Sequence, residues 1–194
     1  MIRPEQGPKA RKEQLRALCR ARGAALTAEY RAQADAAIRA AVSASAAWRQ
    51  AEGVFLYVSV RTEPDTRALI DLALREGKRV YVPRCLPGGV MQAARVRSAA
   101  GLRAGAFGIP EPDGGAEAAE PGDFSLAVVP CAAAGRGGER LGHGAGYYDR
   151  FLRAFPCATL CLCHEALLVD GIPMEADDVR MDCVVTERGI YRKD

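Results

Sequence analysis

Two short apolar runs on either side of one helical segment constrain the fold of this chain more than any other feature. Residues 54–58 and 79–83 have the length and the β-branched or aromatic content of buried strands. Between them, residues 64–75 open with Pro-Asp and carry leucine, isoleucine and alanine at helical spacing, and Gly77 follows the last turn. A strand, a helix and a second strand in this order predict a parallel sheet covered by helices.

The other periodic segments extend this pattern. We expect helices at residues 9–24, from the capping Thr27 to about residue 42, and at 147–155. Further strands are expected at residues 90–96, 126–130, 158–163 and 183–186, with 126–130 central and 90–96 outermost. Residues 101–122 are rich in Gly, Pro and acids and predict a surface loop. The sequence therefore predicts one domain over residues 1–194, a three-layer α/β/α fold with a mostly parallel sheet and a cleft at the carboxyl ends of the strands.

Composition excludes several classes of protein. A chain of 194 residues that is 49% hydrophobic and 26% charged can bury one sizeable core. A net charge of +3 is too small to argue for nucleic acid, so no such partner is expected. Since no apolar run approaches the roughly 20 residues of a membrane span, and the first residues lack the apolar centre of a signal peptide, we expect a cytoplasmic protein without a membrane partner. A monomer is expected.

Seven cysteines, an odd number, are best explained as buried free thiols in a reducing compartment. Cys161-Leu-Cys163-His164 resembles a fragment of a zinc site but lacks a second pair of ligands at metal-binding spacing. A cysteine nucleophile is weakly supported, because His164 is the sole base nearby in the sequence.

The segment most suggestive of chemistry is GRGGERLGHGAG at residues 135–146, followed by YYDR. It joins a predicted strand to a predicted helix, so its glycines can bring backbone N–H groups and a helix N-terminus to an anion. Arg136, Arg140 and His143 can add positive charge. The segment lacks the G-K-[ST] ending of a P-loop and the G-x-G-x-x-G spacing of a dinucleotide site. The alternative reading is a flexible turn; we interpret the segment as the catalytic centre of a nucleotide-using enzyme.

An acid follows at once in the helix. Asp149 can simply stabilise the helix dipole, or it can bind Mg²⁺ beside nucleotide phosphates. A second carboxylate would then come from Asp177, Asp178 or Asp182. Tyr147 and Tyr148 are either packing residues or ligand contacts, and we assign at least one to the ligand.

These residues carry a specific resemblance. Val129-Pro130 followed by Glu139-Arg-Leu-Gly-His-Gly-Ala-Gly-Tyr-Tyr-Asp-Arg150 resembles the signature of the 5-formyltetrahydrofolate cyclo-ligase family. Further similar elements occur in the same order over nearly the whole chain: Lys12-Glu-Gln-Leu-Arg16, Thr62-Glu-Pro-Asp-Thr66, Gly77-Lys78 with Val82-Pro83, Gly108-Ile-Pro-Glu-Pro112 and Pro173-Met-Glu-Ala-Asp-Asp178.

The resemblance implies an ATP- and Mg²⁺-dependent conversion of 5-formyltetrahydrofolate to 5,10-methenyltetrahydrofolate, with ADP and phosphate released through a phosphorylated formyl group. Its implied partners are a reduced folate and ATP.

The resemblance also implies roles for individual residues. Arg140, His143 and Tyr148 would be catalytic, and Asp149 and Asp178 would hold Mg²⁺. The nucleotide would contact Lys12, Arg16, Arg140, Leu141, Gly142, His143, Gly144, Ala145, Gly146, Tyr147 and Tyr148. The folate would contact Val58, Glu63, Tyr147 and Tyr148. Without the resemblance, Lys12 and Arg16 read as a solvated helix face, and Glu63 as the acid of a helix cap at Thr62.

The chain departs from the family pattern at three places. Residues 131–135 lack the usual phenylalanine and aspartate, His143 replaces a basic residue, and residues 163–166 replace F-x-x-Q. Two alternatives therefore stay open: a relative that activates another formyl, formimino or amide substrate with ATP, and a catalytically weak module that binds RNA or a protein.

Overall fold

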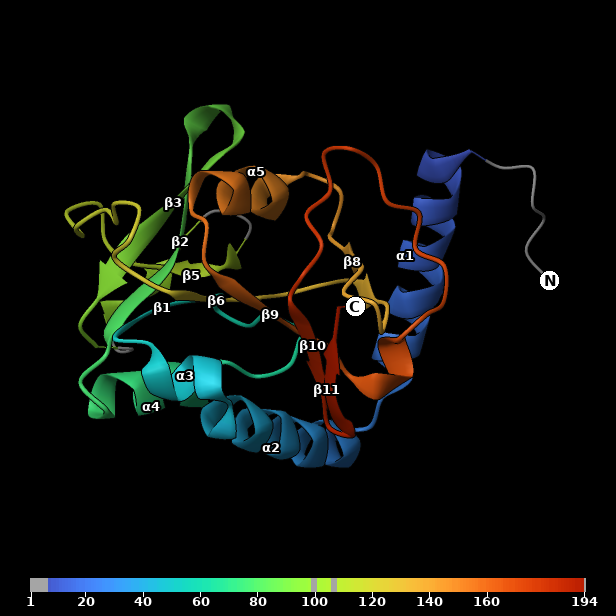
Figure 1. The fold of residues 1–194 in the computed structure, drawn as a ribbon, viewed down its shortest axis with the longest axis horizontal. Helices are drawn as coiled ribbons and strands as arrows, with labels where there is room; N and C mark the ends of the chain where they lie inside the picture. Colours follow the sequence, from blue (N-terminus) through green and yellow to red (C-terminus); the bar gives the residue numbers. More distant parts are fainter. Residues whose placement is uncertain (1–6, 99–100, 106–107, 194) are drawn as a thin grey trace.

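The computed structural model describes residues 7–98, 101–105 and 108–193, and a seven-stranded sheet crosses the molecule (Figure 1). Its order is β11-β10-β9-β6-β1-β2-β3. The strands are β1 (Gly53–Leu56), β2 (Arg79–Leu86), β3 (Val90–Val96), β6 (Leu126–Val129), β9 (Ala158–Leu162), β10 (Cys183–Thr186) and β11 (Gly189–Arg192). The five inner strands are parallel, and β3 and β11 pair antiparallel at the two edges. The predicted mostly parallel sheet, with residues 126–129 central and 90–96 at an edge, is confirmed.

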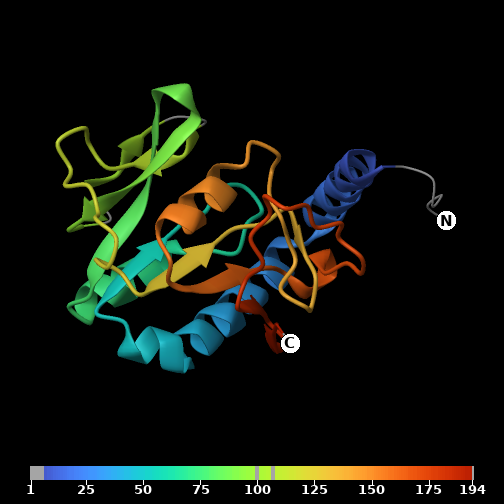
Figure 2. The same cartoon turned by 45° about the horizontal axis from the view of Figure 1, so that its top comes forward.

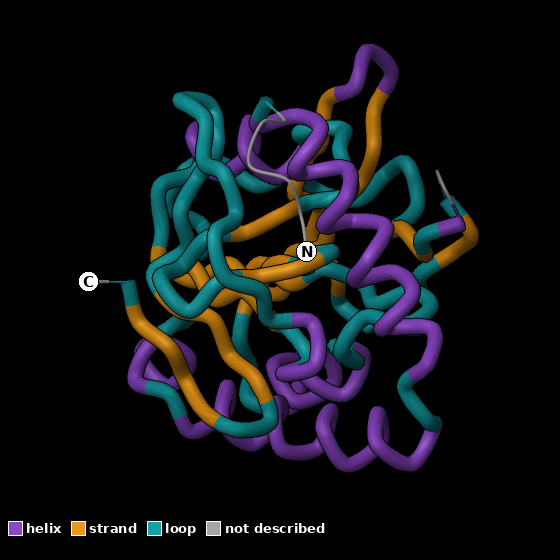
Figure 3. The backbone as a smooth tube through the Cα atoms, turned by 90° about the vertical axis from the view of Figure 1, so that its right-hand side faces the viewer, coloured by secondary structure: helices purple, strands orange, loops and turns teal. Residues whose placement is uncertain are grey.

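Helices cover both faces of this sheet. They are α1 (Pro8–Ala25), α2 (Ala28–Ala44), α3 (Ala46–Gln50), α4 (Arg67–Arg75) and α5 (Tyr147–Ala154), with short 3₁₀ turns η1 (Pro87–Gly89) and η4 (Glu165–Leu167). Figures 1 and 2 show α2, α3 and α4 on one face and α5 on the other. Figure 3 shows α1 running along one end of the molecule, where it contacts η4 and the segment after β6. Within the described residues, no helix is both long and apolar enough to cross a bilayer.

Strand alternation builds a separate apolar cluster on each face. Val54 and Leu56 pack with Trp48 and Ile70 in one cluster, whereas Phe55 packs with Phe151 in the other. With one apolar cluster between helices and sheet on each face, the molecule has the three layers expected from the sequence.

Some elements differ from the prediction. Residues 101–122 contain two short strands, β4 (Arg103–Ala104) and β5 (Pro110–Glu111), besides loop; residues 106–107 lie outside the described part. The sequence did not predict the α3 helix. Ser45 ends α2 and also caps the next five residues, so α3 follows α2 with no loop between them to mark a second helix. The sequence did not predict the β11 strand, because Gly-Ile-Tyr-Arg is not an apolar run. A strand at the edge of a sheet is partly exposed and can carry such a mixed sequence.

Candidate active site

The glycine-rich segment divides into two parts with different tasks. Residues 135–139 join the short strands β7 (Ala133–Ala134) and β8 (Arg140–Leu141) into a hairpin. Gly138 has a φ of +86°, a Cβ there would overlap the carbonyl of Met181, and the Met181 amide donates to the Gly138 carbonyl. This half of the segment is therefore a structural hairpin fixed to the chain before β10. Residues 142–146 are the part of the segment left to form the expected anion-binding loop.

Arg136, which the sequence suggested as a source of charge for an anion, lies elsewhere. Its guanidinium pairs with Glu165 at 2.8 Å and lies over the ring of Tyr191 at 5.2 Å. It does not line the cavity described next.

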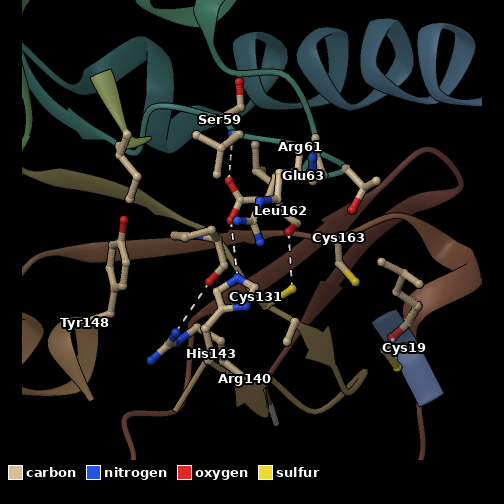
Figure 4. Close-up of a pocket in the computed structure, with 18 of the residues that line it drawn as sticks. Cys19, Ser59, Arg61, Glu63, Cys131, Arg140, His143, Tyr148, Leu162 and Cys163 are labelled. Carbon is tan, nitrogen blue, oxygen red and sulfur yellow. Dashed lines mark hydrogen bonds and ion pairs between the residues drawn. The ribbon is translucent and has the colours of Figure 1, made fainter. Parts of the chain in front are cut away.

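A cavity of about 1030 Å³ lies where β1, β6 and β9 end. Its walls come from α1, the start of α2, the loops after β1, β6 and β9, residues 142, 143, 145 and 146, and the first turn of α5; Figure 4 shows part of this lining. The predicted cleft at the carboxyl ends of the strands is therefore present, and it is large enough for more than a single small ligand.

The N-terminus of α5 opens into this cavity. Gly146 precedes the helix in the left-handed conformation, with a φ of +66°, and no side chain caps the first turn. The first amides of a helix lack partners within the helix, and the helix dipole favours an anion at this end.

Arg140 is the central charged group of the site. Its side chain is 2% exposed, and Nη2 donates to Asp149 Oδ1 at 2.8 Å. Nη1 donates to the Pro130 carbonyl at 3.4 Å, and its guanidinium lies over the Tyr148 ring at 5.6 Å. Nε is buried and has no partner among the described residues. The strand end and the first helix turn thus fix a buried guanidinium that still has a donor to use.

A second ion pair lies beside the first. Lys12 Nζ donates to Asp178 Oδ2 and Glu175 Oε2, both at 2.6 Å. Since the amide of Val179 donates to Asp149 Oδ1 at 3.2 Å, the segment after Asp178 is held against Asp149. The structure therefore brings together the two acids that the sequence assigned to a metal, each paired with a cation.

Burial and pairing shift the charges of the second pair. Burial alone raises the pKa of the Asp178 carboxyl, but hydrogen bonds from Lys12 and the Glu175 amide outweigh it, so this pKa lies below its usual range. For Lys12, burial lowers the pKa, and the same contacts with Asp178 and Glu175 outweigh it and raise the pKa. Both groups stay charged at neutral pH.

A magnesium ion fits this donor set. Mg²⁺ takes one or two carboxylates and completes its shell with water and phosphate oxygens. Asp149 lines the cavity, and Asp178, which does not line it, directly precedes the residue whose amide donates to Asp149. Within the described residues, no group of three or more His, Cys, Asp or Glu side chains is placed to share a metal. A metal here would therefore need phosphate oxygens to complete its coordination.

Glu63 and His143, which are 80 residues apart, meet across the cavity. His143 Nε2 lies 3.3 Å from Glu63 Oε1, and Glu63 Oε2 accepts from the amide of Val60 at 3.0 Å (Figure 4). Glu63 thus closes a turn in the loop after β1 instead of capping a helix at Thr62. Tyr148 also lines the cavity, where burial, followed by the nearby Glu63 charge, raises the pKa of its phenol, so the phenol stays protonated and can donate.

The remaining predicted residues are placed as follows. Arg16 Nε donates to the Gly142 carbonyl at 2.8 Å, and Arg16 lines the cavity with Gly142, Ala145, Gly146 and Tyr147. Gly144 lies beside the Arg16 guanidinium. Five predicted residues do not line the cavity: Lys12, Val58, Leu141, Gly144 and Asp178. Lys12 is buried in its ion pairs with Asp178 and Glu175, and Val58 and Leu141 are 2% exposed in apolar clusters. The buried side chains of Lys12, Val58 and Leu141 are not open to a ligand in this conformation.

All seven cysteines are free, as the sequence predicted, but only four are buried; Cys85, Cys157 and Cys183 are half-buried. The pKa of each of the buried thiols Cys131, Cys161 and Cys163 is raised. At Cys161 the hydrogen bond with Cys131 and burial both raise the pKa. At Cys131 and Cys163 a hydrogen bond with a neighbouring thiol lowers the pKa, but burial and the other thiol contacts outweigh it. Protonated thiols are poor nucleophiles, so the cysteine-nucleophile reading gains no support.

The sequence did not single out several residues of the cavity wall, namely Arg20, Arg31, Asp35 and Arg61, and it suggested His164 only as a base or zinc ligand beside the cysteines. One signal was available for Arg20, because it follows Arg16 by four residues and so shares a face of α1 with it. His164 is fully buried and its Nε2 lies 3.0 Å from Asp35 Oδ1, a contact across 129 residues that no local pattern reveals.

A mostly parallel sheet with a large cavity at its strand ends, a helix N-terminus and a fixed arginine–carboxylate pair is the architecture of an α/β enzyme with a site suited to an anionic small molecule. Comparison with known proteins gives the particular family. The chain belongs to the 5-formyltetrahydrofolate cyclo-ligase family, whose profile matches residues 8–187, and it is a ligase enzyme.

Individual relatives agree. The chain is 38% identical over 146 residues to the 5-formyltetrahydrofolate cyclo-ligase of Mycolicibacterium smegmatis, covering 71% of this chain and 75% of that protein. It is 32% identical over 162 residues to the probable 5-formyltetrahydrofolate cyclo-ligase of Schizosaccharomyces pombe, covering 75% and 79%. The NMR structure of Aquifex aeolicus 5,10-methenyltetrahydrofolate synthetase superposes with a TM-score of 0.83 at 30% identity, covering 93% of this chain and 92% of that one.

Proposed function

We propose that this protein converts 5-formyltetrahydrofolate to 5,10-methenyltetrahydrofolate with Mg-ATP, releasing ADP and phosphate. The observation that carries the proposal is Arg140, a buried guanidinium fixed by Asp149 beside the α5 N-terminus, with an unpartnered Nε. Family membership supports the general reaction, and the volume of the cavity, about 1030 Å³, is large for a single small ligand.

The chemistry needs charge neutralisation and positioning. The formyl oxygen is a poor leaving group until it attacks the γ-phosphorus of ATP, which breaks the bond to the ADP oxygen and yields a phosphorylated formyl group. N10 then attacks the formyl carbon, the carbon–oxygen bond breaks, phosphate leaves with the former formyl oxygen, and the N10 proton is released. Phosphoryl transfer of this kind depends on orientation and on stabilising developing negative charge.

Residues around the α5 N-terminus would hold the nucleotide. In this proposal, the amides of residues 142–146 and of the first α5 turn bind phosphate oxygens, and Arg140 donates to the transferring group. Arg16 braces the segment through the Gly142 carbonyl, and His143 adds an imidazole donor at its exposed tip. Leu141 contributes through its backbone, since its side chain is buried.

Asp149 and Asp178 would hold Mg²⁺, which would neutralise phosphate charge when bound. For that, each acid has to exchange a contact with Arg140 or Lys12. The two released cations would then be free to contact the nucleotide, which gives Lys12 its proposed part in binding despite its place behind the cavity wall.

The folate would lie against the loop after β1. The Glu63 carboxylate would accept from the N–H edge of the pterin, and Tyr147 and Tyr148 would line the reacting end. Val58 is buried, so its proposed part is to anchor residues 59–63.

The deciding experiment is a spectrophotometric assay of methenyltetrahydrofolate from 5-formyltetrahydrofolate and Mg-ATP. We expect product and ADP in equal amounts. Tight ATP binding without this product would favour an enzyme for another formyl, formimino or amide substrate, and salt-sensitive RNA binding without ATP turnover would favour a binding module. The single domain over residues 1–194, the monomeric state and the cytoplasmic location are part of the proposal and stay predictions.

A further inference from the structure

Three buried thiols lie together at the floor of the cavity, and the proposed chemistry uses none of them. Cys131 follows the end of β6, Cys161 lies in β9 and Cys163 follows it. Each is at most 7% exposed. Cys131 and Cys163 also stand in two of the stretches where the sequence departs from the family pattern. We call the three residues the thiol cluster.

The pairing of β6 with β9 brings the thiol cluster together. The two strands are parallel with Val129 opposite Cys161, so Cys131 and Cys163 each come two residues after this pair. Because side chains alternate along an extended chain, Cys161 and Cys163 share one face of the sheet. All three cysteines pack in the same apolar cluster. The sheet register therefore places Cys131 beside both thiols of the β9 segment, although it is far from them in the sequence.

Cys131 is the central thiol of the cluster. Its Sγ donates at 3.4 Å to the carbonyl of Leu162, the residue between the other two cysteines (Figure 4). Its thiol also makes hydrogen-bonding contact with the thiols of Cys161 and Cys163. Cys131 and Cys163 line the cavity, whereas Cys161 does not. A ligand that enters the cavity can therefore reach two adjacent sulfur atoms at its floor.

The ligands available here suit a soft ion of low coordination number. Among the described residues, no group of three or more His, Cys, Asp or Glu side chains is placed to share a metal, so the cluster does not offer the four ligands of a structural zinc ion. His164, the next residue, turns its Nε2 to Asp35 at 3.0 Å. Two sulfur atoms without a further ligand match the linear coordination that copper(I) accepts, and thiolates select this ion.

We propose that Cys131 and Cys163 form a binding site for one copper(I) ion. On binding, the two S–H bonds break, two Cu–S bonds form and two protons pass to the solvent, so the step needs no oxidant or reductant. The complex carries one net negative charge. Arg140 supplies positive charge close by, since its Nη1 donates at 3.4 Å to the carbonyl of Pro130, the residue before Cys131. Burial does not prevent ionisation of these thiols once the ion is present, because a coordinating thiol is deprotonated outright.

The test titrates the reduced protein with copper(I) under anaerobic conditions, in competition with the coloured chelator bathocuproine disulfonate. We expect one tightly bound ion per chain and two protons released for each ion. Cys131→Ala and Cys163→Ala should each weaken binding at least about 100-fold, because the loss of a group that only contacts a metal ligand already costs about 10–100-fold. Cys161→Ala removes such a contacting group and should weaken binding by about tenfold or less.

The matched control is Cys85→Ala. Cys85 also lines the cavity and is half-buried, so it is more accessible than the thiol cluster. If copper(I) reacted with thiols according to their exposure, Cys85→Ala would lower the amount of bound copper and Cys131→Ala would not. The proposed site predicts the reverse.

Two further measurements complete the test. X-ray absorption of the copper-loaded protein should show two sulfur ligands and no nitrogen ligand. Where an alanine variant melts early, Cys131→Ser keeps the size of the side chain and replaces the sulfur by a hard oxygen, so it should lose the ion as well. Absence of bound copper in the wild type, a nitrogen ligand on the ion, or a folded Cys131→Ser protein that binds copper as the wild type does would each overturn the proposal.

Discussion

Replacing Arg140 tests two roles of one side chain, because Arg140 both stabilises the fold and faces the proposed reaction. The Arg140 and Asp149 side chains are 2% and 16% exposed and pair at 2.8 Å. Breaking a buried pair costs about 3–5 kcal/mol, and Asp149 keeps the Val179 amide, so we expect Arg140→Met to lose about 3 kcal/mol. At about 2–4 °C per kcal/mol for a chain of this size, the melting temperature should fall by roughly 6–12 °C.

The loss of turnover in Arg140→Met should be larger than partial unfolding of the variant explains. A donor aimed at developing charge contributes about 10²–10³-fold to kcat, so we expect a loss of that size at a temperature where the variant is fully folded. Arg140→Lys keeps the charge but cannot reach both Asp149 and the Pro130 carbonyl, so it should be intermediate.

The matched control is the double variant Arg140→Met/Asp149→Asn. It removes the unpaired carboxylate, so it should recover most of the lost stability in guanidinium unfolding while turnover stays low. Two assays on each variant, chemical unfolding and methenyltetrahydrofolate formation, measure both effects. A folded Arg140→Met enzyme that keeps turnover within twofold of the wild type would refute the reasoning.

Three further variants, one of them with a matched control, test the surroundings of this pair. Lys12→Met should lose about 1.5–3 kcal/mol at neutral pH. The Asp178 pKa is lowered from 3.8 on folding, so the pairing of Asp178 stabilises the fold above pH 3.8, and this stability is lost as the pH falls through the lowered pKa. The free energies of unfolding of wild type and variant should therefore converge in acid. A difference that stays constant with pH would contradict the pairing. Asp149→Asn should raise the Mg²⁺ concentration needed for half-maximal turnover, and an unaltered titration would return this acid to a helix-stabilising role. Gly138→Ala should lose about 1–3 kcal/mol through its positive φ, and Gly114→Ala, in open space, should lose little; equal losses in urea unfolding would refute the docked hairpin.

Local patterns in the sequence predicted the helices and inner strands, because periodicity and turn residues act over short distances. Thr27 shows this: its hydroxyl accepts from the Tyr30 amide at the predicted start of α2. The α3 helix and the β11 strand had no such pattern, since one is five residues long and the other is a mixed-polarity edge. Short and edge elements depend on tertiary contacts that the local sequence does not encode.

The candidate site was predicted through its glycines, Arg140 and Asp149, which lie close in sequence. Long-range pairing was not predictable. Lys12 reads as a solvated residue from helical spacing, yet the fold buries it between Glu175 and Asp178, more than 160 residues away. Conversely, Arg136 reads as part of an anion loop, yet the hairpin turns it to Glu165. The partners of Lys12 and Arg136 depend on how α1 and the chain before β10 pack around the sheet.

The fate of one oxygen atom tests the central claim most directly. If 5-formyltetrahydrofolate labelled with ¹⁸O in the formyl group is turned over with Mg-ATP, the proposed transfer predicts one ¹⁸O atom in each inorganic phosphate released, as read by mass spectrometry. Unlabelled phosphate, with the heavy oxygen recovered in water, would contradict it.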